Sequence, residues 1–329
     1  MPILTTDFND LVKNAKVQGN NTAMEFPEVR NQIAVIKNVT EKKSEYSSLS
    51  TLPTARKRGD GANAYKGSAK QGYTKNFNQE DFALEVDVSY QMRKFDKYDE
   101  IMKRVRAAKN SVVRRFEQNI AGILGYAWSS SYQNLEGDTV TTTTPDGTTL
   151  ISASHACNGS AATWSNQLTG NHAPISQTTL EDLLQLFNNF LDDGDGRSLT
   201  VLPTTIISGT HFPTVHEINR ILGSELASGT PNNDKNVNKG LLNHIIVPFL
   251  DFTLSTEARD STKSKYVFVA NLNSDINGIV AEVSADPFLD PPATVTESGI
   301  WQFVASGMQD FGTVRASFIA GTKGTGAAI

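Results

Sequence analysis

Cysteine is almost absent from this 329-residue chain, in which Cys157 is the only one. A single thiol cannot form a disulfide within the chain, which excludes a disulfide-stabilised secreted domain. No stretch approaches the roughly 18 consecutive apolar residues of a membrane-spanning helix, and the N-terminal segment lacks the basic and apolar parts of a secretion signal. We therefore expect a protein that is made and used in a cytoplasm. Its hydrophobic residues, 38% of the chain, suffice for an ordinary core.

Motifs for catalysis, metals and cofactors are also scarce. The glycine-rich segment 321–326 lacks the spacing of a phosphate-binding loop, and the acidic segment 192–196 lacks the glutamate that closes a calcium loop, so we interpret the latter as an acidic turn. Two pairs of zinc-ligand residues lack a third ligand: His155 with Cys157, and His211 with His216. We predict no catalytic residue, no metal site and no cofactor, and keep a soluble hydrolase or metal enzyme as a less favoured alternative.

Charge is distributed unevenly along the chain. The net charge is −5, which argues against a broad surface that binds nucleic acid. Residues 1–124 carry 21 basic and 15 acidic side chains, whereas residues 125–329 carry 9 basic and 20 acidic ones. Neighbouring copies could therefore attract one another head to tail, although within one monomer the asymmetry would affect only the solvated surface.

The N-terminal quarter of the chain has little core. Residues 1–40 are polar and form a predicted arm, and between Ser47 and Gly72 there are too few large apolar residues to fold alone. Apolar and polar residues alternate over 82–89, which predicts a strand that could pair with residues 73–77. We therefore expect region 41–92 to be a long β-hairpin that projects from the body.

A long amphipathic helix is predicted over residues 96–124, because apolar residues recur there at steps of three and four. The stripe consists of Tyr98, Ile101, Met102, Val105, Ala108, Val112, Val113, Phe116, Ile120, Ile123 and Leu124. Acidic residues at its start and Gly125 after its end favour these limits. The opposite face carries Lys103, Arg104, Arg106, Lys109, Arg114 and Arg115. We interpret that face as solvated and not as a nucleic-acid contact.

The rest of the chain mixes helices and strands. Two further helices are predicted over 178–191 and 215–227, the second after Pro213. Buried strands are predicted at 199–202, 205–207, 244–247, 266–270 and 279–283. No unit recurs at a fixed spacing, so the fold class is α+β and not a repeat array.

The order of several short blocks resembles one protein family. The first blocks hold Asp146, Gly147, Leu150, Ser152, His155, Asn166, Ile175, Ser176, Leu180 and Glu181. The later ones hold Asp195, Gly196, Arg197, Leu199, Pro203, residues 266–270, Trp301, Phe311, Gly312, Val314, Arg315 and Phe318. This order is similar to that of the major capsid proteins of tailed bacteriophages from about residue 80 onward. Ile151 and Ala156 depart from the family pattern, in which Phe and Pro are expected.

The resemblance implies an α+β fold of the Hong Kong type, with five parts. These are an N-terminal arm (1–40), an extended loop (41–92), a peripheral domain (93–175) with the spine helix 96–124, an axial domain (176–290) and C-terminal strands (291–329) that return to the peripheral domain. The implied function is a structural subunit that forms pentamers and hexamers of an icosahedral phage head around double-stranded DNA. Such a protein is located in the virion after assembly in the bacterial cytoplasm. An encapsulin-like compartment shell is the alternative.

The partners follow from the same resemblance, whereas the contact residues follow from the charge distribution. About 40 residues precede the loop, so we expect a separate scaffolding protein, besides a portal protein, a candidate decoration protein and DNA bound without sequence specificity. The basic loop residues are expected to meet a neighbour's acidic surface: Arg56, Lys57, Arg58, Lys66 and Lys70. Some relatives crosslink a loop lysine to a neighbour's asparagine. Candidates by location are Lys57, Lys66, Lys70 and Lys75, which we interpret as solvated lysines.

Overall fold

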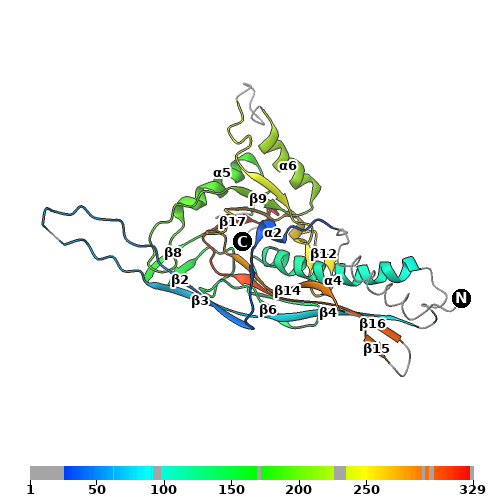
Figure 1. The fold of residues 1–329 in the computed structure, drawn as a ribbon. Coiled ribbons are helices and arrows are strands. Elements are labelled where there is room, and N and C mark those ends of the chain that lie inside the picture. Colours follow the sequence, from blue (N-terminus) through cyan, green and yellow to red (C-terminus); the bar gives the residue numbers. More distant parts are fainter. Residues whose placement is uncertain are drawn as a thin grey trace.

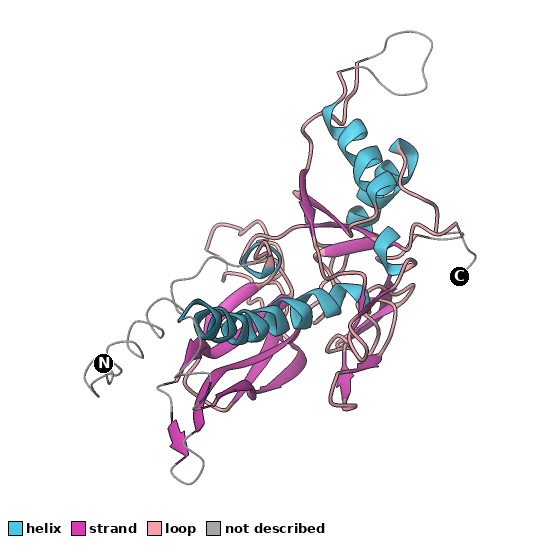
Figure 2. Ribbon diagram, turned by 90° about the vertical axis from the view of Figure 1, so that its right-hand side faces the viewer, coloured by secondary structure: helices cyan, strands magenta, loops and turns pink. Residues whose placement is uncertain are grey.

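The structure is a computed structural model that describes residues 26–61, 63–89, 91, 98–168, 172–225, 235–290, 293–295 and 300–326. Two sheets form the body, one beneath the long helix α4 and one beneath the helices α5 and α6 (Figures 1 and 2). A hairpin projects from one side of this body (Figure 1). Residues 1–25 of the predicted arm and the predicted helix start at 96–97 lie outside the described residues.

The larger sheet has five strands, with β14 and β16 at its centre. β1 (Val35–Asn38) pairs in parallel with β14 (Ile279–Leu289). β16 (Ile300–Thr313) is antiparallel to β14, and both β4 (Glu80–Val88) and the short β15 (Ala293–Val295) are antiparallel to β16. Strands that are remote in the sequence therefore lie side by side, and the sheet joins the first third of the chain to its end.

The helix α4 (Tyr98–Gly125) lies across one face of this sheet and confirms the predicted long helix and its end. Every residue of the predicted stripe whose side chain is described is buried. The first half of the stripe packs on inward residues of the strands, among them Val283 and Phe303. Its last turns, with Ile120, enter a second cluster that also contains Phe268 of the smaller sheet. One helix therefore contributes to both halves of the core.

The smaller sheet has the order β10-β9-β13-β17. Its strands are β10 (Asn243–Ile246), β9 (Thr205–Ser208), β13 (Val267–Ala270) and β17 (Ile319–Thr322). β9, β13 and β17 are buried along their whole length. Because side chains alternate, Phe268 points to the cluster shared with α4, whereas Val267 and Val269 point to the cluster shared with α5 (Gln177–Leu186) and α6 (Phe212–Gly223). A strand buried on both faces is typical of a sheet between two layers.

The projecting hairpin differs from its prediction in extent and in pairing. β2 (Lys43–Leu49) pairs antiparallel with β3 (Gln71–Asn78), so residues 73–77 face β2 and not the strand at 82–89. β4 belongs to the body, where Phe82 and Val86 help to cover α4. The hairpin therefore spans residues 43–78, and the predicted extended loop 41–92 is too long at its C-terminal end. Alternation predicted the strand correctly, but alternation does not identify a strand's partner.

The other predicted elements are mostly confirmed. The predicted strands at 205–207, 244–247, 266–270 and 279–283 correspond to β9, β10, β13 and the first part of β14. The helix predicted over 178–191 is shorter, because α5 gives way to a 3-10 turn at Phe187–Asn189. The helix predicted over 215–227 is α6, which begins one turn earlier, with Pro213 in its first turn. The predicted strand at 199–202 is wrong, since no strand forms there.

The remaining elements are short. They are α2 (Arg30–Ile33), the 3-10 turn Lys263–Lys265, and the strand pairs β5 (Ser131–Gln133) with β6 (Thr139–Thr141), β7 (His155–Cys157) with β8 (Ser160–Trp164), and β11 (Phe252–Thr253) with β12 (Ala258–Arg259). None of the helices in the described ranges combines the length and the apolarity that crossing a membrane requires.

Candidate functional site

The loop between β2 and β3, residues 51–70, is exposed along nearly its whole length. Every residue described in it is exposed except Pro53, which is half-buried. All five predicted contact residues lie in this loop: Arg56, Lys57, Arg58, Lys66 and Lys70. The Arg56 guanidinium lies over the ring of Tyr65, 4.0 Å from its centroid, which links the two arms of the loop. Figure 1 shows that the loop extends away from the body. The basic residues therefore lie outside the chain's own core.

The base of this loop is closed by main-chain hydrogen bonds. The Ser50 N–H donates to the Lys70 carbonyl at 2.8 Å, and the Lys70 N–H donates to the Ser50 hydroxyl at 2.8 Å. The Asn158 carboxamide, in the turn between β7 and β8, donates to the carbonyls of Gln71 and Gly72. Lys70 therefore lies at the base of the loop, where its ammonium donates to the Gly159 carbonyl at 3.4 Å, and not near the tip with Arg56.

The acidic segment 192–197 supports the same base. One carboxylate oxygen of Asp192 accepts from the Thr51 N–H at 2.9 Å, and the other accepts from the Gly194 N–H at 2.8 Å. Gly194 lies so close to Ser50 that an added Cβ would stand 2.6 Å from the Ser50 Cβ. The segment is thus a turn, as predicted, and the turn holds the root of the loop. Sequence reasoning missed this role, because nothing in the sequence links Asp192 to residue 51.

Two facing carboxylates join the hairpin to the larger sheet. Glu282 of β14 and Asp310 of β16 are direct neighbours in the antiparallel register. Glu282 accepts from the Ser44 hydroxyl at 2.6 Å, and Asp310 accepts from the Asn78 N–H. Burial raises the pKa of Asp310 to about 6, and the nearby carboxylates add to this, although the N–H donors oppose it. Burial also lowers the pKa of Lys75, whose ammonium donates to the Thr143 carbonyl.

Four residues of the family-like blocks form one buried polar network. His155 Nδ1 lies 2.7 Å from an Asp146 carboxylate oxygen, and Nε2 lies 3.2 Å from the Asn166 side-chain oxygen. That oxygen also accepts from the Ser152 N–H at 2.8 Å. Burial would raise the pKa of Asp146, but hydrogen bonds from His155 and Thr144 lower it to about 2. Both ring nitrogens of His155 are engaged, so this histidine is a structural residue and no metal ligand with Cys157.

A buried glutamate on α4 holds the chain just before β1. Glu117 accepts from the N–H groups of Val29 and Arg30, at 3.1 and 3.0 Å. Its carboxylate also lies 3.8 Å from the Arg30 guanidinium. Burial raises the pKa of Glu117, and the two N–H donors counteract this. The described end of the arm region is therefore fixed to the helix, a contact that the sequence alone does not indicate.

These sites share a physical character. Their polar groups bind one another and the main chain, and in the described part of the chain no group of three His, Cys, Asp or Glu side chains is arranged to hold a metal ion. The features that stand out are an elongated two-sheet body, a firmly anchored root and an exposed basic loop. Such an arrangement suits a protein that assembles through contacts between copies.

Solved structures with the same fold come from tailed-phage particles. The capsid structure of the Cyanophage P-SCSP1u aligns with a TM-score of 0.52 at 13% identity, over 91% of this chain and 89% of that one. The capsid of Myoviridae Phage XM1 aligns with a TM-score of 0.52 at 11% identity, over 92% and 94%. A chain from Gordonia phage Cozz aligns with a TM-score of 0.53 at 9% identity, over 92% and 89%. The predicted α+β phage capsid fold is therefore confirmed.

The sequence itself identifies the family. A family model described as phage capsid protein matches residues 72–328, which is most of the chain, whereas no curated protein matches. The chain belongs to the phage capsid protein family. It is a structural subunit of a phage head, which self-assembles and is located in the virion capsid. The family match favours this function over an encapsulin-like compartment.

Proposed function

We propose that this chain is the repeating subunit of a closed icosahedral shell, built from pentamers and hexamers, that encloses double-stranded DNA. In this proposal the part with α4 and the five-stranded sheet is the peripheral domain, and the part with α5, α6 and the four-stranded sheet is the axial domain. The projecting loop joins each subunit to its neighbour through Arg56, Lys57, Arg58, Lys66 and Lys70. The contact is heterologous, so it closes into a ring when the rotation from one subunit to the next is one fifth or one sixth of a full turn.

The loop is the observation that carries this proposal. Folding a segment of 20 residues costs conformational entropy that buried apolar surface must offset, and residues 51–70 bury almost none in their own chain. The root, in contrast, is held by Ser50, Asp192 and Asn158. An exposed loop whose base is held by hydrogen bonds is stabilised when its exposed residues bind a partner outside their own subunit.

The charge distribution supports a neighbouring copy as that partner. The loop carries five basic side chains and one acidic side chain, whereas residues 125–329 carry 20 acidic and 9 basic ones. Complementary charges on two surfaces of one molecule set which faces meet, even where each exposed pair contributes only about 0–1 kcal/mol.

The further partners are those of a head assembled in the bacterial cytoplasm. We propose a separate scaffolding protein, a portal protein at one vertex, DNA contacted without sequence specificity, and a decoration protein as a candidate. The family match supports a structural and not an enzymatic role, and we assign no catalytic residue, metal or cofactor.

Electron microscopy of the expressed chain tests this proposal. With a scaffolding protein supplied, uniform closed shells are expected, and the chain alone should give aberrant particles or none. A monodisperse monomer under all conditions would contradict the shell function. Efficient uniform shells from the chain alone would contradict the need for a scaffold only.

A further inference from the structure

A short segment follows β17 and is tied to the residues that precede α5. The Thr322 hydroxyl donates to the Ala173 carbonyl at 3.1 Å, and the Gly326 N–H donates to the His172 carbonyl at 2.6 Å. These two hydrogen bonds fix both ends of residues 322–326, which we call the 322–326 segment.

Gly324 lets this segment pass close to the body. Its φ is +63°, and an added Cβ would stand 2.4 Å from the Lys265 carbonyl oxygen. Glycine adopts this conformation without strain and leaves the space free. The Lys323 side chain lies over Trp128, with its ammonium 5.6 Å from the ring centroid. The segment therefore lies at the place where Trp128, just after α4, packs on Phe268 of β13.

His172 is buried beside this segment and lacks a hydrogen-bond partner. The residue is only 1% exposed, and within the described residues neither ring nitrogen has a partner. The ring meets Trp128 edge to face, with centroids 5.6 Å apart. An imidazole in such a place is favoured in its neutral form, since a buried charge without a partner is costly.

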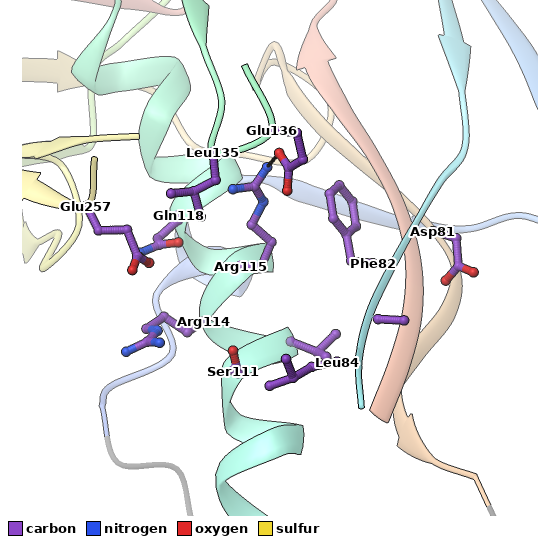
Figure 3. Close-up of a pocket in the computed structure, with 12 residues that line it drawn as sticks. Asp81, Phe82, Leu84, Ser111, Arg114, Arg115, Gln118, Leu135, Glu136 and Glu257 are labelled. Carbon is purple, nitrogen blue, oxygen red and sulfur yellow. Dashed lines mark hydrogen bonds and ion pairs between the residues drawn. The ribbon is translucent and has the colours of Figure 1, made fainter. Parts of the chain in front are cut away.

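The charged neighbour of His172 is a cation. Elsewhere in the chain a carboxylate fills such a place, as where Arg115 donates to Glu136 at 2.8 Å beside the groove between α4 and β4 (Figure 3). At His172 the neighbour is the Lys323 ammonium, and no carboxylate of the described residues raises the pKa of the imidazole. Protonation of His172 would therefore place two positive charges close together in a buried site.

Burial lowers the pKa of His172, and the Lys323 ammonium lowers it further. The other titratable groups at this place are Lys265, a second cation, and Tyr266, whose pKa burial and Asp260 raise, so that the phenol stays neutral near neutral pH. A solvated histidine has a pKa near 6.5, so the closed segment binds a proton at His172 less readily than an opened one does. The closed state is therefore fully favoured above this value and loses stability as the pH falls below it.

We propose that His172 and Lys323 form a pH-sensitive latch for the 322–326 segment. Neutral His172 lets the segment stay packed on Trp128. Once His172 has taken a proton from water, it repels Lys323, and the segment opens so that both charges are hydrated. Opening breaks the two hydrogen bonds to the residues before α5 and uncovers the Trp128 ring. The latch goes beyond the proposed shell function and does not depend on it.

Hydrogen exchange of the Gly326 amide in the full-length chain tests the latch. After correction for the intrinsic exchange rate at each pH, the opening constant should be larger at pH 5 than at pH 7.5, by up to about tenfold for each unit by which the pKa of His172 is lowered. His172→Gln cannot be protonated, so its opening constant should be equal at both pH values. Lys323→Gln keeps the histidine but removes the repelling charge, so its opening constant should rise less on acidification than the parent's.

Trp128 gives a second measurement of the same opening. The chain has three tryptophans, so a background with Trp164→Phe and Trp301→Phe leaves Trp128 as the only one. Acrylamide should quench its fluorescence more strongly at pH 5 than at pH 7.5, because the open segment no longer covers the ring. Adding His172→Gln to this background should remove the difference.

His216→Gln, at an exposed position of α6, is the matched control and should keep the parent's dependence on pH. A local measurement is needed because global unfolding also reports Asp193 and Asp310, whose raised pKa values act in the opposite direction. An opening constant of the parent that does not change with pH would overturn the latch, as would an unchanged pH dependence in His172→Gln. A response of Lys323→Gln equal to the parent's would also overturn it, and this variant decides the question if His172→Gln fails to fold.

Discussion

The helix α4 and the projecting loop place their side chains in opposite environments. α4 buries its apolar stripe within its own chain, against both sheets. The loop exposes apolar and basic residues alike, and only its root is held by the body. α4 is therefore specified by contacts within the subunit, whereas the loop, in the proposed function, makes its contacts with a neighbouring subunit. Substitutions in the helix should therefore affect folding first, whereas substitutions at the loop tip should affect assembly alone.

The largest expected effect is on the helix. Ile120→Asp places a carboxyl in a cluster with Phe268 and Phe318, where nothing pairs with it. The expected cost is about 3–5 kcal/mol, a large part of the roughly 5–15 kcal/mol by which a typical domain is stable. Urea unfolding followed by circular dichroism measures it. Lys103→Asp on the exposed face of the same helix is the matched control and should change stability by less than about 1 kcal/mol. Wild-type stability of Ile120→Asp would show that the apolar stripe of α4 is not packed in the core.

A smaller effect is expected where the hairpin joins the sheet. The pKa of Asp310 is raised to about 6 in the folded chain, above the usual value near 4. The folded state therefore binds more protons between these values, so the contribution of Asp310 to stability is greatest below pH 4 and falls as the pH rises through about 6. Asp310→Asn removes the charge but keeps only one oxygen for the two N–H groups, of Asn78 and Phe311, that the carboxylate binds. The variant should therefore be more stable than the parent at pH 7.5 by on the order of 1 kcal/mol.

Unfolding midpoints in urea between pH 4 and 8 measure this difference. Asp193, whose pKa burial likewise raises to about 6, should leave a residual slope of the same sign in the variant. Asp81→Asn, at an exposed position of the neighbouring strand, is the control and should keep the parent's pH profile. A profile of Asp310→Asn that is parallel to the parent's would rule out the raised pKa.

The same contrast explains what the sequence could predict. The stripe of α4 and the buried strands β9 and β13 were predictable, because periodicity reports burial within the chain. The strand pairing was not predictable. Alternation over residues 82–89 indicates the strand β4 but fits any partner, and its actual partner β16 lies more than 200 residues away, which leaves β3 to pair with β2. The predicted strand at 199–202 failed for a related reason, because Leu199 and Val201 cover a core without pairing and Leu202 is exposed.

The amino-acid composition indicated the basic loop, but it did not indicate the residues that hold the base of the loop and the end of the arm. The five basic residues of the loop were found because few apolar residues accompany them. Asp192, Asn158 and Glu117 were missed, because each binds main-chain N–H or C=O groups that lie 86 to 141 positions away. Main-chain groups leave no residue-specific signal in a sequence. Long-range contacts of this kind become visible only in the folded chain.

At the root of the loop, a moderate effect is expected. Asp192→Ala removes the acceptors of the Thr51 and Gly194 N–H groups, which should cost about 1–3 kcal/mol. Hydrogen exchange of these two amides should accelerate, since the root can then open without global unfolding. Asp60→Ala, in the exposed loop itself, is the matched control and should leave both amides unchanged. Equal exchange rates in the Asp192→Ala chain and the parent would show that the turn does not hold the root.

At the loop tip, the smallest effect on the monomer is expected together with a large effect on the shell. Changing Arg56, Lys57 and Arg58 to Glu converts a local charge of +3 to −3 at exposed positions. No core contact is lost, so circular dichroism and unfolding should match the parent to within about 1 kcal/mol. Assembly should fail at low salt, because each subunit would then present like charges to its neighbour. High salt should restore it in part, because at 1 M salt the Debye length is only about 3 Å and the repulsion is screened.

Light scattering and electron microscopy across a salt series measure this outcome, and a triple Gln variant separates lost attraction from added repulsion. If attraction sets the docking, the Gln variant should assemble with intermediate efficiency and a weaker dependence on salt than the parent, because fewer charges remain to be screened. If bulk or apolar contacts of the loop dominate, the Gln variant should behave as the parent does. Normal assembly of the triple Glu variant at low salt would show that the tip lies in solvent. Other surfaces would then have to hold the subunits together.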